Sequence, residues 1–380
     1  MKYFASVTQH TRYDPWPLMG KNLLQKADIQ IEGIRPWDIR IRHHGFFKRI
    51  MLQGLLGLGE SYMDGWWECD RLDIFIYKFL AHKLDEAVPG YYSDIMMGLS
   101  GKILSRKSDD CGCSALEKEY GIGYDVFAHM LDPYMQFSCG YWRAGATLAE
   151  AQEAKLKMVC EKLQLAPGMR VLDIGCGWGG TAEYMARHYD VYVEGITNST
   201  EEQKVAQSRC QGLDITIMLE DYQDLPDDKF DRIIALGALE YVELKNYQNF
   251  FKAVARSLKP DGLFLLHSTG STQLVNHVGP WLNKYIFPNG CLPSGQQLVQ
   301  SIEPYFKIED WDNLGTDYDK TLMSWFEKIN ESWPALSMNH SPKLKRMLDY
   351  YLCSGAGFFR AGKIQLRQIL LCIGGDGKTI

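Results

Sequence analysis

The sequence has no long apolar run and none of the cysteine patterns that mark a metal or disulfide framework. No stretch exceeds ~18 consecutive apolar residues, and residues 1–17 lack the basic stretch and apolar core of a secretion signal. Ten cysteines are present, but none forms a CxxC pair, and no histidine spacing indicates zinc. These absences predict a cytoplasmic protein without a membrane-spanning helix or a metal, whose cysteines are mostly reduced and buried.

An excess of positive charge is also absent. The chain carries 41 lysines and arginines against 47 acidic residues, a formal net charge of −6, which argues against a nucleic-acid-binding protein. The first 60 residues differ, because nine basic residues there face five acidic ones. Arg35, Arg40, Arg42, Lys48 and Arg49 lie close together in this part. The cluster either faces an anionic membrane surface or forms an ordinary solvated face.

The pattern along the 380 residues indicates two domains. Residues 1–105 mix short helical and strand-like patterns and are rich in aromatic residues, most densely at 62–68. Apolar residues at 95–104 recur at helical spacing, so they face either the core or a membrane. Residues 106–118 are small and polar and are interpreted as a linker. We expect the second domain to span residues 119–380.

The second domain alternates strand and helix patterns, as a parallel sheet requires. Strands are expected at 170–174, 191–197, 215–219, 232–236 and 263–267, with helices over 180–188, 201–211 and 246–258. Runs at 306–311 and 365–372 would complete a seven-stranded sheet, the last strand antiparallel. The expected fold class is therefore α/β and Rossmann-like, with ligands at the carboxyl ends of the strands.

The residues most informative about chemistry are 171–180, Val-Leu-Asp-Ile-Gly-Cys-Gly-Trp-Gly-Gly. Gly175 and Gly177 let the backbone approach a ligand closely, and the following helix offers unpaired N–H groups. A turn without a ligand and a dinucleotide site both fit this loop. Asp173 favours S-adenosylmethionine (SAM), because a carboxylate there can accept hydrogen bonds from the amine of SAM. Glu194, about twenty residues after the first glycine, keeps a nicotinamide dehydrogenase possible.

Polar residues follow the next strands as well. Thr197, Asn198 or Glu202 could bind ribose hydroxyls after the second strand, in place of the usual acidic residue. Asp221 and Tyr222 follow the third strand and either bind adenine or form a plain turn.

Two buried strands end in ionisable residues. Glu240 follows an almost wholly apolar run, and His267 is the last residue of another. Each needs a partner or a ligand, because a polar group is costly to bury alone. Both strand ends belong to one cleft, which favours a functional role over a structural one. Cys139 lies in a segment expected to cover the cofactor. No adjacent base is evident, so a packing or backbone role is favoured over a nucleophilic one.

Several segments together make the chain resemble the bacterial cyclopropane-fatty-acyl-phospholipid synthases over nearly its whole length. They are 57–70 (Gly-Leu-Gly-Glu-Ser-Tyr-Met-Asp-Gly-Trp-Trp-Glu-Cys-Asp), 137–142 (Phe-Ser-Cys-Gly-Tyr-Trp), 171–180, 265–267 (Leu-Leu-His), 283–293 (Asn-Lys-Tyr-Ile-Phe-Pro-Asn-Gly-Cys-Leu-Pro) and 317–318 (Asp-Tyr). The glycine loop is common to many methyltransferases, whereas the first and fifth segments are far more specific.

The resemblance implies a class I SAM-dependent methyltransferase fold with a seven-stranded, mostly parallel sheet and a smaller, mainly helical N-terminal domain that engages lipid. The implied reaction adds a methylene unit from SAM across the cis double bond of an unsaturated acyl chain in a membrane phospholipid. A bound bicarbonate would remove the proton that allows the cyclopropane ring to close. The implied enzyme is a homodimer associated peripherally with the inner face of the membrane.

The resemblance also assigns residues. Bicarbonate would be held by Cys139 and Thr269 through the backbone and by Glu240, His267 and Tyr318 through side chains. SAM would be bound by Phe137, Ser138, Gly175, Gly177, Thr197, Asn198, Glu202, Asp221 and Tyr222, with Asp173, Cys176, Trp178 and Gly179 completing the loop.

Four kinds of departure from the family pattern leave alternatives open. Tyr241 stands where histidine is common, Glu202 where glutamine is usual, and Gly355 where some members carry cysteine, while Glu119, Gly121 and Tyr124 alter a segment expected to border the cofactor. These changes admit a fatty-acyl C-methyltransferase with a methyl-branched or exomethylene product, or a diverged, non-catalytic lipid-binding paralogue.

Overall fold

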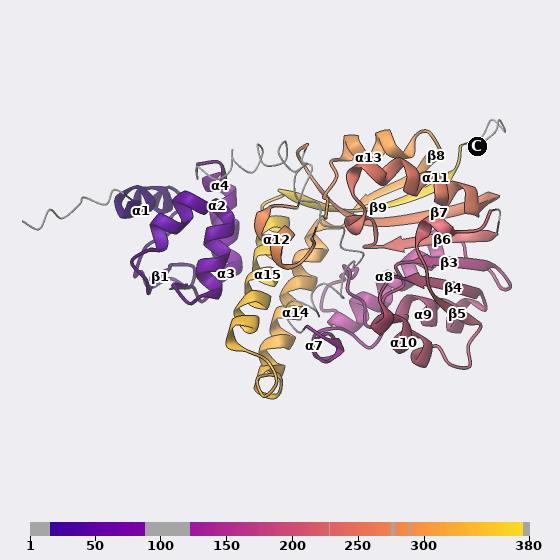
Figure 1. Ribbon diagram of the computed structural model, residues 1–380, viewed down its shortest axis with the longest axis horizontal. Helices are drawn as coiled ribbons and strands as arrows, with labels where there is room; N and C mark the ends of the chain where they lie inside the picture. The colour runs from indigo at the N-terminus through magenta and orange to yellow at the C-terminus, as the bar shows by residue number, and fades with distance from the viewer. Residues whose placement is uncertain (1–15, 88–121, 228, 275–277, 289, 375–380) are drawn as a thin grey trace, which may run out of the picture.

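A seven-stranded sheet forms the centre of the computed structural model, which describes residues 16–87, 122–227, 229–274, 278–288 and 290–374 (Figure 1). Its strands are β3 (Arg170–Ile174), β4 (Tyr192–Thr197), β5 (Ile215–Leu219), β6 (Phe230–Leu236), β7 (Leu258–Ser271), β8 (Phe306–Asn313) and β9 (Ile364–Ile373). Their order is β5-β4-β3-β6-β7-β9-β8. β9 runs antiparallel to both of its neighbours, and the other pairings are parallel. The expected sheet, including its antiparallel last strand, is confirmed.

Both faces of the sheet are covered by helices, so the central strands are apolar on both sides. Successive residues of β3 point to opposite faces: Val171 packs in the core beneath α8 and α9, and Leu172 in the core beneath α11 and α13. The helices are α8 (Leu148–Lys162), α9 (Gly180–Tyr189), α10 (Thr200–Arg209), α11 (Tyr247–Ser257) and α13 (Gly295–Ile302). The doubly wound arrangement places the carboxyl ends of β3, β4, β6 and β7 along one edge.

Strand β7 is longer than the sequence pattern predicted. Its apolar stretch ends at His267, but β9 pairs with it as far as Ser271, opposite Ile364. Backbone pairing therefore continues through the polar residues Ser268 and Thr269, which alternation of apolar residues alone does not reveal. This extension carries Thr269 to the site described below.

The N-terminal part is mainly helical, as expected. It contains α1 (Trp16–Lys26), β1 (Arg40–Ile41), α2 (Phe46–Met63), β2 (Trp67–Glu68), α3 (Leu72–Ala81) and α4 (Leu84–Ala87). Helices α2 and α3 pack on α15 (Figure 1), and α2 also contacts α12 (Pro280–Tyr285), where Lys284 pairs with Glu60.

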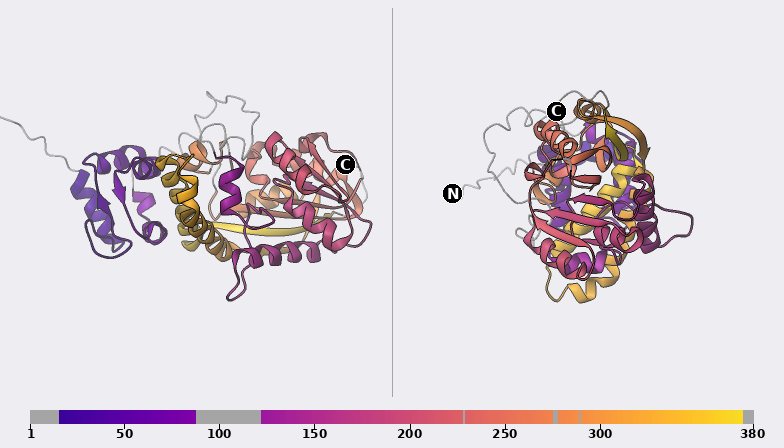
Figure 2. Two further views of the ribbon diagram at one scale, coloured as in Figure 1. Left: turned by 90° about the horizontal axis from the view of Figure 1, so that it is seen from below. Right: turned by 90° about the vertical axis from the view of Figure 1, so that its right-hand side faces the viewer.

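Two long helices that the sequence pattern did not predict separate the N-terminal part from the sheet (Figure 2). They are α14 (Gly315–Leu336) and α15 (Pro342–Arg360). Ser341 caps α15, accepting a hydrogen bond from the Leu344 N–H, and Pro342 occupies its first turn, a typical start signal. Shorter elements are α7 (Tyr124–Met130), α12 (Pro280–Tyr285), η1 (Tyr222–Asp224), η2 (Leu239–Tyr241) and η3 (Leu244–Asn246).

Some expectations fall outside the described residues. They are the apolar face at 95–104, the linker 106–118, and the departures Glu119 and Gly121. Among the residues that the structure does describe, no helix is long and apolar enough to span a bilayer.

Candidate active site

The glycine loop after β3 exposes its backbone, while its side chains are buried. Gly175 and Gly177 have positive φ angles of 73° and 52°, which residues other than glycine adopt only at a cost in conformational energy. Both are accessible, whereas the side chains of Cys176 and Trp178 lie in the core. Gly179 is the left-handed residue before α9. The sequence-predicted loop thus offers a ligand its main chain only.

Asp173 lies just before this loop and is 2% exposed. Its Oδ2 has no hydrogen-bond partner among the described residues. Burial raises the pKa of this carboxyl to about 7, and the positive charge of Lys155 opposes that shift. A buried carboxylate oxygen without a donor can accept a hydrogen bond from an amine.

At the end of β4, Thr197 donates a hydrogen bond from Oγ1 to Glu202 Oε2, at 2.5 Å. Asn198 next to them is exposed. Glu194, the residue that kept a nicotinamide site possible, is held by Arg170 (2.6 Å) and Lys229 (2.5 Å). Its carboxylate is therefore committed to two ion pairs, which disfavours the dehydrogenase interpretation.

After β5, Asp221 caps the short helix η1, because its Oδ1 accepts a hydrogen bond from the Gln223 N–H at 2.9 Å. The ring of Tyr222 packs edge-to-face on Phe250, with 5.1 Å between centroids. Both the turn and the adenine-binding interpretations fit this geometry, and the adenine contact stays a prediction.

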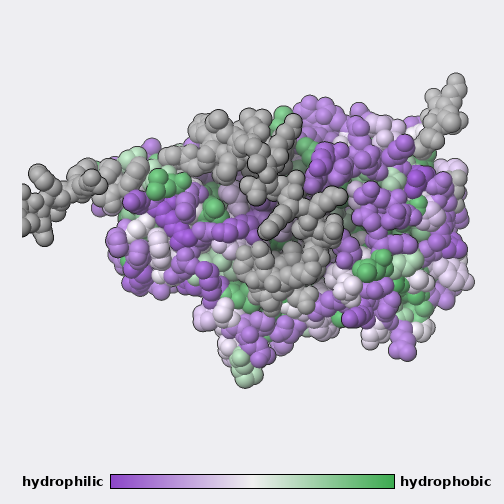
Figure 3. Space-filling view, in the orientation of Figure 1, coloured by the Kyte–Doolittle hydropathy of each residue, from purple (hydrophilic) through white to green (hydrophobic). Residues whose placement is uncertain are grey.

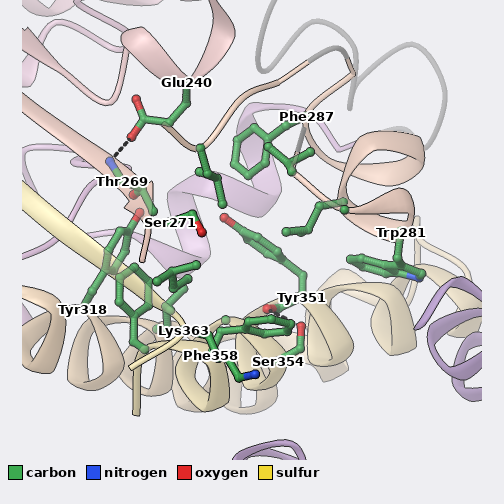
Figure 4. A pocket seen from close by; sticks show the side chains of 18 of the residues that line it. Glu240, Thr269, Ser271, Trp281, Phe287, Tyr318, Tyr351, Ser354, Phe358 and Lys363 are labelled. Carbon is green, nitrogen blue, oxygen red and sulfur yellow. Dashed lines mark hydrogen bonds between the residues drawn. The ribbon is translucent and has the colours of Figure 1, made fainter. Parts of the chain in front are cut away.

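A largely apolar cavity of about 270 Å³ lies beside the carboxyl ends of β6 and β7 (Figure 4). Six of the predicted site residues line it: Phe137, Ser138, Glu240, His267, Thr269 and Tyr318. The rest of the wall comes mostly from positions that the sequence analysis did not assign to the site. Among them are Leu55 of α2, Ile76, Phe79 and Leu80 of α3, and Tyr350, Tyr351, Phe358 and Phe359 of α15. Their signal in the sequence was the apolar periodicity of these three helices.

Glu240 is the strongest polar feature of this cavity. Thr269 donates a hydrogen bond from its backbone N–H to Glu240 Oε1 at 2.6 Å, and Oε2 has no partner among the described residues (Figure 4). Burial raises the pKa of Glu240 to about 7, against the hydrogen bonds from Thr269. Burial therefore moves the ionisation of this carboxyl group from the acidic range toward neutral pH. The Thr269 N–H, predicted to bind bicarbonate, is used here to orient Glu240.

His267 lies on β7 and is buried, with 1% of its surface exposed. The Gln368 amide nitrogen lies 3.4 Å from His267 Nδ1, and an amide nitrogen can only donate, so Nδ1 accepts. The ring proton is then on Nε2, which has no partner in the described part of the chain. Burial, assisted by the charges of Lys155 and Lys162, lowers the pKa of His267 to about 3. The ring is neutral and directs one free N–H donor.

Tyr318 adds a third polar group from α14. Burial raises the pKa of its phenol well above the ordinary value, so the hydroxyl stays protonated. Its ring packs on Phe359, with 4.8 Å between centroids. The cavity thus combines a carboxyl group of raised pKa, a neutral imidazole and a protonated phenol.

Cys139 is completely buried, and its Sγ contacts Thr321 Oγ1 at 3.9 Å. Burial raises the pKa of this thiol, which keeps it from forming a thiolate. This favours the backbone or packing role over a nucleophilic one.

Besides Glu202, which binds Thr197, three departures from the family pattern can be placed. Tyr241 and Gly355 both line the cavity, so they alter its wall. Tyr124 stacks edge-to-face on Trp178 of the glycine loop, at 5.3 Å between centroids. These residues lie where they could change the preferred lipid or the fit of the cofactor.

The basic cluster of the N-terminal part is largely neutralised by acidic neighbours. Arg35 pairs with Asp28 and Asp38, and Arg49 with Glu60 and Asp64. Arg40 and Arg42 both approach Glu68, and Arg40 also binds Asp70. This pairing favours the solvated charged face over an electrostatic membrane surface.

Comparison with known proteins identifies the family of this chain. The family model described as mycolic acid cyclopropane synthetase matches residues 107–369. A cyclopropane-fatty-acyl-phospholipid synthase of Escherichia coli (strain K12) is 53% identical over 361 residues, covering 95% of this chain and 94% of that protein.

Solved structures give the same result. The cyclopropane synthase MmaA2 from Mycobacterium tuberculosis aligns with a TM-score of 0.63 and 29% identity, over 70% of this chain and all of the other. The mycolic acid cyclopropane synthase CmaA1 in complex with SAH and CTAB aligns with a TM-score of 0.62 and 29% identity, over 68% of this chain and 97% of the other. The chain therefore belongs to the mycolic acid cyclopropane synthetase family of SAM-dependent enzymes.

Proposed function

We propose that the protein transfers a methylene unit from SAM to the cis double bond of an unsaturated acyl chain in a membrane phospholipid, forming a cyclopropane ring. The family supports SAM-dependent cyclopropanation of lipids. The observation that carries the finer proposal is the polar cluster Glu240, His267 and Tyr318 in the wall of a largely apolar cavity.

The cavity suits an acyl chain because aliphatic and aromatic side chains dominate its wall. Tyr351 projects into it from α15, with Trp281 and Phe287 on the far side from Tyr318 (Figure 4). An alkene is a weak nucleophile, so it must be held in line with the sulfonium methyl where water is excluded. Aromatic faces such as that of Tyr318 also stabilise the positive charge that develops on the chain.

The polar atoms of this cluster fit a bicarbonate ion. Glu240 Oε2 and His267 Nε2 have no partner among the described residues. Glu240 Oε2 can accept a hydrogen bond from the bicarbonate hydroxyl, and His267 Nε2 and the Tyr318 hydroxyl can donate hydrogen bonds to the charged oxygens of bicarbonate. When bound, SAM would supply the methyl group and bicarbonate the base that removes a proton. Glu240, oriented by the Thr269 N–H, would fix the position of that base. His267 would remain neutral, because its lowered pKa keeps it from taking up the proton that bicarbonate removes.

Removal of dissolved bicarbonate tests this assignment. We expect ring formation in carefully degassed, carbon-dioxide-free buffer to fall by about 10-fold or more, as for loss of a general base. Added bicarbonate should restore the rate in a saturable manner, whereas equal chloride should not. Full activity in the depleted buffer would exclude bicarbonate as the base.

We also propose that the N-terminal part contacts the bilayer through exposed apolar side chains. Leu18 and Met19 on α1 and Leu52 on α2 are exposed, Leu52 to 64%. The surface of this part is otherwise mostly hydrophilic in the view of Figure 3, with separate hydrophobic patches. Such side chains can enter the interface between headgroups and acyl chains.

The variant Leu52→Glu is expected to weaken binding to phospholipid vesicles about 5-fold or more, because a charge must then enter the interface. Co-sedimentation with vesicles measures the effect. Met338→Glu is the matched control, because Met338 is 81% exposed in the distant loop between α14 and α15. Equal loss in both variants, or no loss in Leu52→Glu, would place the contact elsewhere.

The remaining proposals rest on the family resemblance. They are a homodimer, and a location at the cytoplasmic face of the membrane. Sedimentation equilibrium should then give twice the chain mass of 43.5 kDa.

A further inference from the structure

The side chain of Lys155 in α8 is 0% exposed, which lysine almost never is unless paired. Its Nζ donates to two neutral acceptors, Gln136 Oε1 and Ser138 Oγ, the latter at 3.1 Å. Among the described residues, no carboxylate lies within ion-pair distance of this ammonium. A buried cation with only neutral partners retains an attraction for an anion.

The hydrogen bonds of Ser138 have a defined direction. An ammonium group can only donate, so Ser138 Oγ is the acceptor of the bond from Lys155. The serine hydroxyl proton must therefore point to another acceptor. The backbone of Ser138 is fixed as well, because its carbonyl accepts a hydrogen bond from Gln152 Nε2 at 2.7 Å. Ser138 lines the cavity and directs a polarised O–H donor.

A buried acceptor complements this donor. Asp173 Oδ2 has no partner in the described part of the chain. Asp173 lies near the end of β3, and the loop after β3 enters α9, where Thr181 Oγ1 donates a hydrogen bond at 3.2 Å to Gln136, the other acceptor of Lys155. One region therefore combines a donor backed by a cation with a free carboxylate oxygen. A ligand that satisfies both carries a carboxylate and an ammonium group, as the amino-acid end of SAM does.

We propose that Lys155 is a positioning residue for SAM: it polarises and orients the Ser138 hydroxyl toward the SAM carboxylate, while Asp173 receives the SAM ammonium group. The inference rests on the proposed use of SAM. A purely structural role is the alternative, since Lys155 also holds Gln136, which accepts a hydrogen bond from Thr181 Oγ1 of α9 at 3.2 Å.

Two ligands distinguish these roles in the full-length protein. S-Adenosylhomocysteine (SAH) has the amino-acid end, and 5′-methylthioadenosine shares the adenosine thioether but lacks that end. In Lys155→Met we expect SAH affinity, measured by calorimetry, to fall about 10-fold or more, as for the loss of a charge-assisted hydrogen bond. The affinity for methylthioadenosine should stay within about twofold.

Two further variants keep the test decisive. Lys157→Met is the control: Lys157 lies on the same helix and its side chain is 62% exposed, so this variant should change neither affinity. Ser138→Ala should reproduce the selective loss of SAH affinity, and the double variant should lose little more than either single one. If Lys155→Met fails to fold, Ser138→Ala still carries the test.

The outcomes separate the inference from the proposed function. The role of Lys155 would be overturned if both variants lost affinity for SAH and for methylthioadenosine equally. Unchanged SAH affinity in these variants would overturn it as well. Failure of the unaltered protein to bind SAH would instead overturn its proposed use of SAM.

Discussion

Glu240→Gln is expected to lower the rate of cyclopropane formation by about 10³-fold while SAH affinity stays within twofold. The side-chain oxygen of glutamine can still accept the hydrogen bond from Thr269, so the local fold is retained. The amide is neutral, so it lacks the charged oxygen that accepts the hydrogen bond from the bicarbonate hydroxyl. Product formation on vesicles, measured by mass spectrometry, and calorimetry with SAH give the two quantities.

Glu243→Gln is the matched control for this variant. Glu243 lies three residues further on, and its carboxylate pairs with Lys245 at the surface. It should keep the full rate. A normal rate in Glu240→Gln would show that the carboxylate does not hold the base, and loss of SAH binding there would show a structural role instead.

Gly180→Ala should remove SAM binding and destabilise the protein by about 3 kcal/mol. A Cβ atom at Gly180 would lie 1.7 Å from the carbonyl oxygen of Tyr134 and 2.6 Å from its carbonyl carbon. Both atoms are backbone, so the chain must move. Tyr134 precedes the segment that carries Gln136 and Ser138, and the displacement therefore reaches the cofactor site.

Thermal unfolding with and without SAH measures this effect. Gly295→Ala provides the control, because Gly295 is also the first residue of a helix, α13, and a Cβ there meets nothing closer than 3.9 Å. That variant should unfold close to the unaltered protein. A Gly180→Ala protein with normal stability and SAH binding would contradict the close approach seen between α9 and the Tyr134 backbone.

The sheet could be predicted from the sequence because its strands are short apolar runs bounded by clear breaks. Arg170–Ile174 and Ile215–Leu219 were predicted with their exact bounds. Glu240 and His267 stood out because an ionisable residue at the end of a buried strand is costly without a partner. The rule that ligands bind at strand ends then placed them in one cleft.

The apolar wall of the cavity could not be derived in the same way. It combines residues from α2, α3 and α15, which are far apart in the sequence and show ordinary apolar periodicity. Lys155 was missed for a related reason, because a lysine on an amphipathic helix usually faces solvent. Its burial is a consequence of how the segment 136–138 folds over α8, which no local pattern records.

The reaction of the purified protein with SAM and vesicles of cis-monounsaturated phospholipid tests the central claim most directly. Acyl mass and proton NMR of the recovered lipid would be measured together. We predict a gain of one CH₂ with cyclopropane ring signals and loss of the alkene signals. The same mass gain with alkene signals retained would identify a C-methyltransferase instead, and no mass gain despite normal SAH binding would contradict catalysis altogether.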